Sequence, residues 1–353
     1  MDHNQIKEII IPIVFALSSF SISYIATQFL RKVTLRYEIV DEPGARRSHT
    51  DPTPRGGGMA FVFSFIMIFS ISPFFYEYNP RSFLGFLFCS SAISILGLLD
   101  DLKSLSRNLR VGIWVGITIV AIFFGISIEE ITFPLIGNVQ LGLFSPLMTF
   151  LWLIGVTNFF NFMDGIDGLA ASEAIVVSLF LSVIAFLSSN NVVFIASVIL
   201  FGGSFGFLFH NFPQANIFMG DGGSNFLGFA FAAMAVIISQ SEDNSIPFLV
   251  TVILLMMFLL DAGTTLIKHL PKGKNWLEPH RDHYYQRLIK SGLSHLQVTL
   301  LYSSLNIILG VVAYAYMIAT NAFIRTGLLA LSVVPFLFVV ILSYRRKQRA
   351  TSG

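Results

Sequence analysis

Long apolar runs are the feature that most constrains how this chain can fold. A helix that crosses a bilayer needs about 20 mostly apolar residues, and eleven runs approach or reach that length. They lie at approximately 9–30, 58–78, 83–99, 111–128, 146–163, 169–187, 192–209, 225–239, 247–267, 296–319 and 323–343. The run at 225–239 is the shortest. The sequence therefore predicts an all-α polytopic membrane protein with about 11 transmembrane helices.

The composition agrees with a bilayer environment. Charged residues make up 12% of the 353 residues and hydrophobic residues 54%, whereas soluble domains carry about 25% charged residues. The net charge is only +2, so neither nucleic acid nor another polyanion is expected as a partner. Cys89 is the single cysteine, which excludes an intrachain disulfide and predicts a small core residue. The first run is long enough to span, so it predicts an uncleaved helix rather than a signal peptide.

The basic residues indicate which loops face the cytoplasm. If the N-terminus is outside, nineteen of the 22 Lys and Arg residues fall on one set of loops and the tail 344–353. Only Lys7, Arg81 and Arg325 fall on the other side. The positive-inside rule therefore predicts a periplasmic N-terminus and a cytoplasmic C-terminus. The whole chain, 1–353, is expected to be one domain, with main cytoplasmic loops at 31–57 and 268–295. A small outer hairpin is expected within 129–144.

Five polar clusters fall on the predicted cytoplasmic side. The first is Asp100-Asp101, which closes the third run. Adjacent helical residues point about 100° apart, so these two carboxylates should have different roles. A solvated helix end is the alternative, but carboxylates oppose the macrodipole at a helix C-terminus.

The second cluster is a ladder of acids and amides. Asn158, Asn161, Asp164 and Asp167 recur every three residues, which would stack them along one side of a helix end. Polar side chains in a membrane span are costly and usually functional. Glycines in the same stretch let backbone approach a ligand closely. A helix-breaking loop would explain these glycines but not the ladder.

The third cluster precedes the eighth run and contains Gly220 and Asp221. A Gly-rich turn that leads into a helix N-terminus can hold an anion. The carboxylate would repel a phosphate unless a divalent cation such as Mg²⁺ lay between them. A flexible turn is the alternative. This cluster predicts a site for a metal and a phosphate.

The fourth and fifth clusters carry histidines and basic residues. His280 and His283 flank Arg281 in a stretch that runs to Gln286. A zinc pair is conceivable, but no Cys or third His has a metal-like spacing, so phosphate contact is favoured over zinc or a solvated loop. The fifth cluster, around Arg55, could hold anionic head groups or only fix the topology.

Two further acids, Glu173 and Asp261, lie within the apolar runs near the same side. Either could be functional, or each could be a bundle-interior carboxylate whose hydrogen bonds are satisfied. The sequence leaves both interpretations open.

Together these clusters resemble the polyprenyl-phosphate N-acetylhexosamine-1-phosphate transferases. That superfamily includes the enzymes that start O-antigen, teichoic-acid and enterobacterial common antigen synthesis, and the muramyl-pentapeptide translocase of peptidoglycan synthesis. The match runs in order along nearly the whole chain, through Pro54-Arg55-Gly56-Gly57, Asp100-Asp101, Asn158 to Leu169, Phe218 to Ser224, and His280 to Gln286. The last segment looks closest to the branch that initiates O-antigen with an N-acetylated, often 6-deoxygenated, hexosamine.

The resemblance implies a reaction and a place for it. A UDP-N-acetylhexosamine would donate its sugar-1-phosphate to undecaprenyl phosphate, giving a lipid diphosphosugar and UMP. The sugar would be N-acetylglucosamine or a 6-deoxy relative such as N-acetylfucosamine or N-acetylquinovosamine. The product would start O-antigen, as part of lipopolysaccharide, or another cell-surface polysaccharide. A multi-pass protein of the bacterial inner membrane is implied, and a homodimer by analogy.

The resemblance also assigns roles to residues. Mg²⁺, or Mn²⁺ in its place, would be bound by Asp221 with help from Asn161. Catalytic roles fall on the acids and histidines of the motifs, which are Asp100, Asp101, Asp164, Asp167, His280 and His283. Of these, Asp164 and Asp167 would shape the nucleotide pocket, and His280 and its neighbours would touch phosphate or sugar. Substrate contacts are expected from Asn158, Phe218, Gly220, Arg110, Arg281 and Arg55, with Phe218 stacked on uracil.

The chemistry favours direct attack by the lipid phosphate. A phosphomonoester has a second pKa of about 6, so undecaprenyl phosphate is already mostly dianionic at neutral pH. We therefore expect one aspartate of the pair Asp100-Asp101 to organise charge rather than to act as a covalent nucleophile.

Two other classes fit less well. A secondary transporter would place polar groups near the bilayer midplane in related halves, whereas here they gather at span ends without a visible repeat. A CDP-alcohol phosphotransferase would need further acids closely spaced after its Asp-Gly motif, but only Glu173 follows before a long apolar run. A non-catalytic scaffold would not require five ordered polar clusters.

Overall fold

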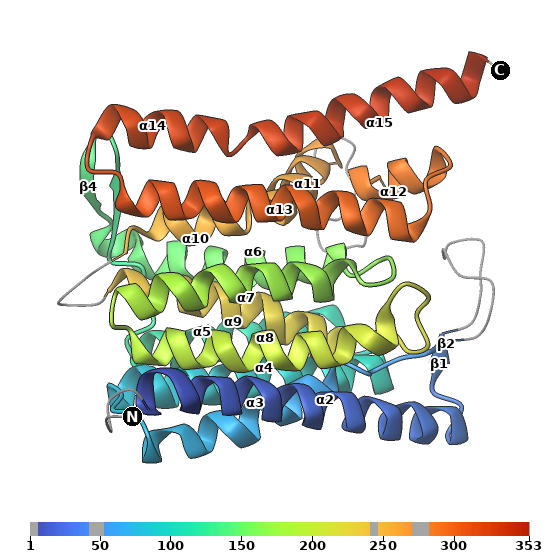
Figure 1. Ribbon diagram of the computed structural model, residues 1–353, viewed down its shortest axis with the longest axis horizontal. Helices are drawn as coiled ribbons and strands as arrows, with labels where there is room; N and C mark the ends of the chain where they lie inside the picture. The colour runs from blue at the N-terminus through green and yellow to red at the C-terminus, as the bar shows by residue number, and fades with distance from the viewer. Residues whose placement is uncertain (1–5, 42–52, 241–245, 270–281, 353) are drawn as a thin grey trace.

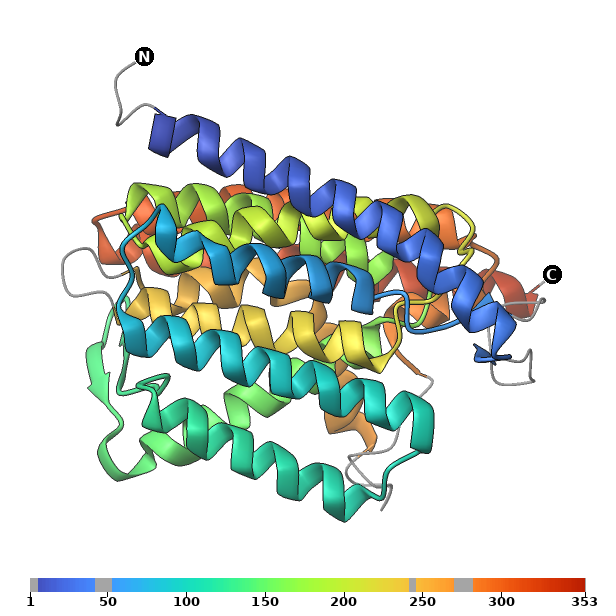
Figure 2. The same cartoon turned by 90° about the horizontal axis from the view of Figure 1, so that it is seen from below.

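The computed structural model describes residues 6–41, 53–240, 246–269 and 282–352, and its helices run side by side along one direction (Figure 1). The first long helix begins at one end of the bundle and the last helix ends at the other. Figure 2 shows α2 (Ile11–Arg36) and α5 (Arg107–Phe123) on opposite edges of the bundle.

The remaining α-helices follow in chain order. They are α3 (Met59–Ile71), α4 (Pro80–Lys103), α6 (Ser145–Met163), α7 (Leu169–Leu187), α8 (Asn191–Asn211), α9 (Asp221–Ser239), α10 (Phe248–Leu254), α11 (Met256–His269), α12 (Tyr284–Lys290), α13 (His295–Ile318), α14 (Ala322–Leu331) and α15 (Val334–Ser352). A short π-helix, η1 (Ile6–Ile10), precedes α2, and two 3-10 turns, η2 (Ser72–Phe74) and η3 (Gly142–Phe144), follow α3 and precede α6.

Every predicted apolar run coincides with helix. Among the described residues, eight helices are long and apolar enough to cross a membrane, and a ninth span results if α10 and α11 are counted together. Two runs give shorter helices, because α3 with its 3-10 turn covers only Met59–Phe74 and α5 has 17 residues. The polytopic all-α architecture is therefore confirmed, while the number of spans and their orientation stay predictions.

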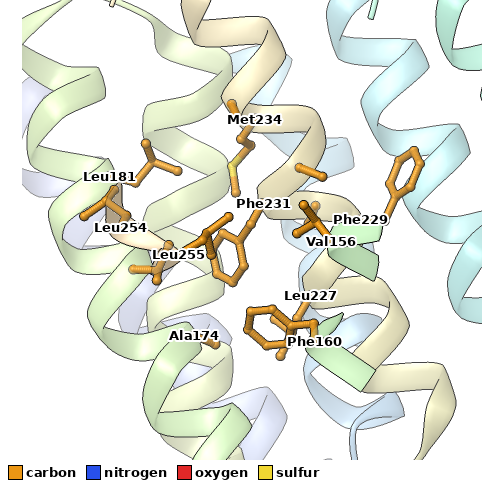
Figure 3. Close-up of a cluster of buried hydrophobic side chains, with 14 of the residues drawn as sticks. Val156, Phe160, Ala174, Leu181, Leu227, Phe229, Phe231, Met234, Leu254 and Leu255 are labelled. Atoms are coloured by element: carbon orange, nitrogen blue, oxygen red, sulfur yellow. The ribbon is translucent and has the colours of Figure 1, made fainter. Parts of the chain in front are cut away.

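The eighth run forms the central helix of the bundle. In α9, 94% of the most apolar window is buried, a larger share than in any other candidate span of the described chain. It packs against α4, α6 and α10, and Figure 3 shows Phe231 of α9 beside Phe160 of α6. Phe231 contacts Phe160 of α6 with ring centroids 5.6 Å apart. The run looks short in the sequence because the first turn of α9, from Asp221 to Ser224, is polar.

The ninth run is not one straight span. The axes of α10 and α11 differ by 78° across Leu255, so the expected helix over 247–267 is broken. The bend carries α11 toward α6, α12, α13 and α15. As a result, α11 lies beside the segment that contains α12.

The connecting segments are partly ordered. The hairpin predicted within 129–144 is confirmed, because β3 (Glu130–Phe133) pairs antiparallel with β4 (Gly137–Gln140). A second pair, β1 (Val40–Asp41) with β2 (Thr53–Pro54), lies within the predicted loop 31–57. The predicted loop 268–295 contains α12, and the predicted tail 344–353 continues α15 as helix to Ser352. Both β1–β2 and α12 lie at the end of the bundle where α15 ends (Figure 1).

Candidate active site

Two segments of the motifs lie side by side along their backbones. The amide of Phe218 donates to the carbonyl of Pro54 at 2.8 Å, and the amide of Gly57 donates to the carbonyl of Phe218 at 2.9 Å. Gly58 continues the ladder by donating to Met219 at 2.9 Å. Main-chain hydrogen bonds therefore join the segment of Arg55 to the segment that precedes Asp221.

Close packing at the start of α9 requires glycine. Gly220 has φ +78°, and a β-carbon there would lie 2.7 Å from Oδ2 of Asp101. A β-carbon at Gly97 of α4 would overlap the main chain of Asp221. These glycines allow α4 to approach the N-terminus of α9, where the Gly222 amide donates to Asp101 Oδ2 at 3.4 Å. The expected Gly-rich turn into a helix N-terminus is confirmed.

The paired aspartates face different partners, as their adjacency predicts. Asp100 Oδ2 lies 2.6 Å from Nη1 of Arg110, and its Oδ1 accepts a hydrogen bond from the Leu105 amide at 2.8 Å. Asp101 has a side chain that is only 4% exposed, and its Oδ1 lies 3.6 Å from Nη1 of Arg55. Arg55 also donates to the main-chain carbonyl of Asp101. Each carboxylate therefore has its own arginine.

The acid–amide ladder is only half helical, which corrects the prediction of one stacked row. Because α6 ends at Met163, Asn158 and Asn161 are helical while Asp164 caps the helix and Asp167 lies in the following turn. The Asn161 amide donates to Asp221 Oδ1 at 3.0 Å and to Ser224 Oγ at 2.9 Å. Asn158 donates to the Ile154 carbonyl of its own helix at 2.8 Å.

Asp167 is held by partners on other segments of the chain. Its Oδ2 accepts from the Ala215 amide at 3.1 Å, and its Oδ1 lies 3.2 Å from Nδ1 of His295. Its main-chain carbonyl accepts from the Thr299 hydroxyl at 2.8 Å. Asp167 thus joins three chain segments, the turn after α6, the loop before α9 and the start of α13. This is the geometry of a framework residue.

Asp164 lies in a crowded electrostatic environment. Burial raises the pKa of its carboxyl well above the ordinary value, and the negative charges of Asp221, Asp101 and Asp167 raise it further. Like charges that share a poorly hydrated site disfavour one another's ionised forms. A cation bound among these groups would remove that repulsion.

One cavity connects several of these residues. It measures about 200 Å³ and opens between α4, α5, α6 and α9. Of the predicted residues it is lined by Asp100, Arg110, Asn158, Asn161 and Asp221. Asp101 and Arg55 lie behind Asp100 and Gly220, and Asp164 lies near Asp221 beyond the end of α6.

The cavity also has lining residues that the sequence analysis did not single out. They are Arg107, Trp114, Phe162 and Asn225, together with the apolar Leu96 and Val111. Arg107 lies three residues before Arg110 on α5, and Asn225 lies four residues after Asp221 on α9. Residues three or four apart share a helix face, so that spacing would have revealed both.

The residues fit a divalent cation of the hard, oxygen-binding kind. Asp221 offers carboxylate oxygens, which Mg²⁺ prefers, and Asp100 lines the same cavity. The NH₂ group of Asn161 donates to Asp221, so its amide oxygen is the atom that would bind a cation. Within 6–41, 53–240, 246–269 and 282–352, no three His, Cys, Asp or Glu side chains are grouped closely enough to hold a metal by themselves. Mg²⁺ usually keeps several waters and binds substrate phosphates as well, so this sparse donor set is suited to a metal that arrives with its substrate.

The histidine segment is only partly described. His280 and Arg281 lie outside the described residues. His283 is 3% exposed, and its Nδ1 lies 3.5 Å from Oδ1 of Asp261. The structure therefore places His283 against α11, not on the cavity wall.

The two interior acids have different environments. Asp261 accepts hydrogen bonds from the amides of Tyr284 and Tyr285. Glu173 accepts one from Asn306 of α13, while its other oxygen is buried and has no hydrogen-bond partner among the described residues. Asp261 is thus a satisfied interior carboxylate beside the histidine segment.

Sequence comparisons agree with this arrangement. The family model described as glycosyl transferase family 4 matches residues 83–239, which contain all the lining residues of the cavity and the central helix α9. The chain is 28% identical over 272 residues to the probable undecaprenyl-phosphate N-acetylglucosaminyl 1-phosphate transferase of Bacillus subtilis, covering 77% of this chain and 75% of that protein. It is 30% identical over 315 residues to the decaprenyl-phosphate N-acetylglucosaminephosphotransferase of Mycolicibacterium smegmatis, covering 81% and 77%.

A third relative is the undecaprenyl-phosphate alpha-N-acetylglucosaminyl 1-phosphate transferase of Escherichia coli, 25% identical over 279 residues and covering 77% of this chain and 75% of that protein. The helical bundle, its cavity lined by aspartates, arginines and asparagines, and these relatives together define a membrane transferase. The chain belongs to glycosyl transferase family 4, the superfamily of polyprenyl-phosphate N-acetylhexosamine-1-phosphate transferases.

Proposed function

We propose that this protein transfers N-acetylhexosamine-1-phosphate from a UDP-sugar to undecaprenyl phosphate and releases UMP. The observation that carries the proposal is the meeting of Asp100, Asn161 and Asp221 with Arg110 around one cavity. These residues come from four different helices, α4, α6, α9 and α5. Both substrates are anionic, so a site for them needs cationic groups that offset their mutual repulsion.

In the proposed reaction an oxygen of the lipid phosphate attacks the sugar-linked phosphorus of the nucleotide sugar. A new phosphoanhydride forms between lipid and sugar phosphate, while the bond to UMP breaks and UMP leaves as the anion. One phosphoanhydride replaces another, so the reaction should be reversible and inhibited by UMP. A bound Mg²⁺ would supply charge neutralisation for the diphosphate, held by Asp221 and Asn161.

The arginines are expected to face the phosphates. The carboxylate of Asp100 lies 2.6 Å from Arg110, which keeps that guanidinium at the cavity wall. Both oxygens of Asp100 already accept contacts from protein groups. This favours direct attack over a covalent intermediate on Asp100, because a nucleophilic oxygen would first have to give up a partner. Asp101 is similarly engaged by Arg55 and Gly222.

The nucleotide is expected next to Phe218, whose ring would stack on uracil at the turn before α9. The neighbouring Gly220 lets the backbone approach the diphosphate. The relatives' names specify N-acetylglucosamine, and we include 6-deoxy N-acetylhexosamines as candidate sugars because of the His280–Gln286 sequence. We place the reaction at the bacterial inner membrane, at the start of O-antigen or another surface polysaccharide.

The test is an assay of the purified protein with undecaprenyl phosphate and a panel of UDP-sugars. We expect UMP release that depends on the lipid and on a UDP-N-acetylhexosamine, and that is faster with one sugar than with the others. Chelation of divalent cations should stop the reaction, and Mg²⁺ or Mn²⁺ should restore it. Wild-type protein that releases no UMP with any of these sugars would overturn the proposal. The mass of the protein in detergent would show whether it forms the homodimer that we propose by analogy.

A further inference from the structure

Asp261 is a buried carboxylate with an unusually complete set of partners. It is 0% exposed, and its Oδ1 accepts from the Tyr284 amide at 2.8 Å. Its Oδ2 accepts from the Tyr285 amide at 3.2 Å and from the hydroxyl of Tyr302 at 2.6 Å. His283 adds a ring nitrogen 3.5 Å away. Three separate elements, α11, α12 and α13, therefore meet at this side chain.

The first turn of α12 depends on Asp261. Amide groups at a helix start have no partner within the helix, and His283, the N-cap residue, provides no side-chain hydrogen bond to them. Asp261 supplies both acceptors from a neighbouring helix. Because the site is buried, an unmatched amide there would lose its hydrogen bond without gaining one from water. The position of α12 is thus fixed by a residue of α11, outside the histidine segment.

From α12 the contacts continue to the cavity. The hydroxyl of Tyr285 donates to the carbonyl of Phe162 at 3.1 Å, and Phe162 lines the cavity. A β-carbon at Gly165 would overlap the Tyr285 hydroxyl, so the turn that begins with Asp164 has room for this tyrosine only because it contains glycine. The ring of His283 stacks on that of Tyr285 with centroids 5.7 Å apart.

We propose that Asp261 is a positioning residue for the sugar-phosphate transfer. It fixes α12, and α12 in turn holds the end of α6 and the Asp164 turn in place through Tyr285. This inference rests on the proposed function, because it assigns Asp261 to the support of that same site. It differs from a substrate-binding role, since the carboxylate is enclosed by protein groups.

Replacement by asparagine should damage catalysis more than nucleotide binding. In Asp261→Asn one oxygen becomes an NH₂ group, which would face a backbone amide that also needs an acceptor. A misplacement of about 1 Å can lower a rate by about 100-fold. We expect kcat to fall by about 10-fold to 100-fold. The KM of the nucleotide sugar should change by less than about threefold, because its proposed contacts lie on Phe218 and Gly220.

The experiment measures UMP release by the full-length protein, together with UMP-binding stoichiometry and the thermal unfolding midpoint. The stoichiometry gives the folded fraction, so a loss of kcat per binding site cannot come from unfolded protein. The matched control is Glu173→Gln, which replaces a second buried carboxylate. This carboxylate lies on α7 and accepts a hydrogen bond from Asn306 of α13. We expect the control to keep the wild-type kcat.

A second variant keeps the test decisive if Asp261→Asn does not fold. Tyr285→Phe leaves both amides of α12 bonded to Asp261 but removes the hydrogen bond to Phe162. It should lower kcat per UMP-binding site by at least about threefold, with KM nearly unchanged. In the combined variant Asp261→Asn/Tyr285→Phe, the loss should be smaller than the product of the two single losses, because both act through α12.

The outcomes separate this inference from the proposed function. Wild-type protein without UMP release overturns the proposed function, and the inference falls with it. Active wild type, with both Asp261→Asn and Tyr285→Phe within twofold of its kcat per binding site, overturns the inference alone. A loss of activity that only follows the loss of UMP-binding sites also overturns it, because Asp261 would then merely support folding.

Discussion

Two groups of aspartates in this protein have similar sequence settings but opposite surroundings. Asp100 and Asp221 line the cavity, where their side-chain partners are Arg110 and Asn161. Asp167 and Asp261 accept hydrogen bonds from backbone amides of other segments. We propose that the first group acts on the ligand and that the second group holds the elements that carry the first. The comparison predicts different consequences for loss of each charge.

The largest effect should come from the cavity group. Asp221→Asn removes the carboxylate that we expect to hold the divalent cation, and kcat should fall by about 1000-fold. The protein should remain folded, because relief of repulsion among neighbouring acids offsets the altered contact with Asn161. UMP release at saturating Mg²⁺ and the thermal unfolding midpoint measure the two quantities. Activity near wild type would remove Asp221 from the proposed metal site.

The framework group should show the reverse pattern. Asp167→Ala leaves the Ala215 amide without its acceptor and removes the contact with His295. The free energy of unfolding should fall by about 1–3 kcal/mol, while kcat per UMP-binding site should fall by less than about tenfold. A loss of kcat as large as that of Asp221→Asn, without a loss of stability, would place Asp167 among the catalytic residues instead.

A glycine substitution tests the contact between α12, which Asp261 holds, and the turn that begins with Asp164. In Gly165→Ala the new methyl group would overlap the hydroxyl of Tyr285, and the strain should lower stability by about 1–3 kcal/mol. The matched control is Gly112→Ala on α5, where a β-carbon has nothing within 4 Å. That control should be neutral, or more stable by about 0.5–1 kcal/mol, because alanine favours helix. Equal stability of the two variants would show that α12 does not pack against the Asp164 turn.

The smallest effect concerns pH. The pKa of Asp164 is raised, so in the metal-free protein ionisation of this group opposes folding. The opposition is absent below the ordinary aspartate pKa of about 3.9 and grows as the pH rises toward the raised value. Asp164→Asn should therefore raise the unfolding temperature in chelator at pH 7, and the gain should shrink as the pH is lowered toward about 4. The same gain at both pH values would exclude titration of Asp164 as its cause.

The sequence alone predicted an all-α polytopic protein and the set of motifs, while the number and orientation of the spans stay predictions. Apolar length predicted the helices, and the ordered motifs predicted that Asp100, Asn161 and Asp221 meet. It was less informative about helix ends. The period of three from Asn158 to Asp167 suggested one row, but α6 stops at Met163. The period of a pattern does not reveal where a helix stops when glycines follow it.

Two other features could not be predicted for physical reasons. The 78° bend between α10 and α11 occurs where neither Gly nor Pro stands near Leu255, so the local sequence carries no signal for it. The proposed role of Asp261 depends on its contacts with α12. Its partner Tyr284 in that helix lies 23 residues later in the chain. A single acid in an apolar run indicates a buried partner but does not identify it.

The most direct test of the account is to measure Mn²⁺ binding by electron paramagnetic resonance in the presence of a UDP-N-acetylhexosamine. The wild type and Asp167→Ala should each bind one ion per nucleotide-binding site, whereas Asp221→Asn should bind Mn²⁺ at least about 100-fold more weakly. The result that would contradict the account is wild-type Mn²⁺ affinity in Asp221→Asn, because the cavity aspartates would then not be the residues that hold the cation.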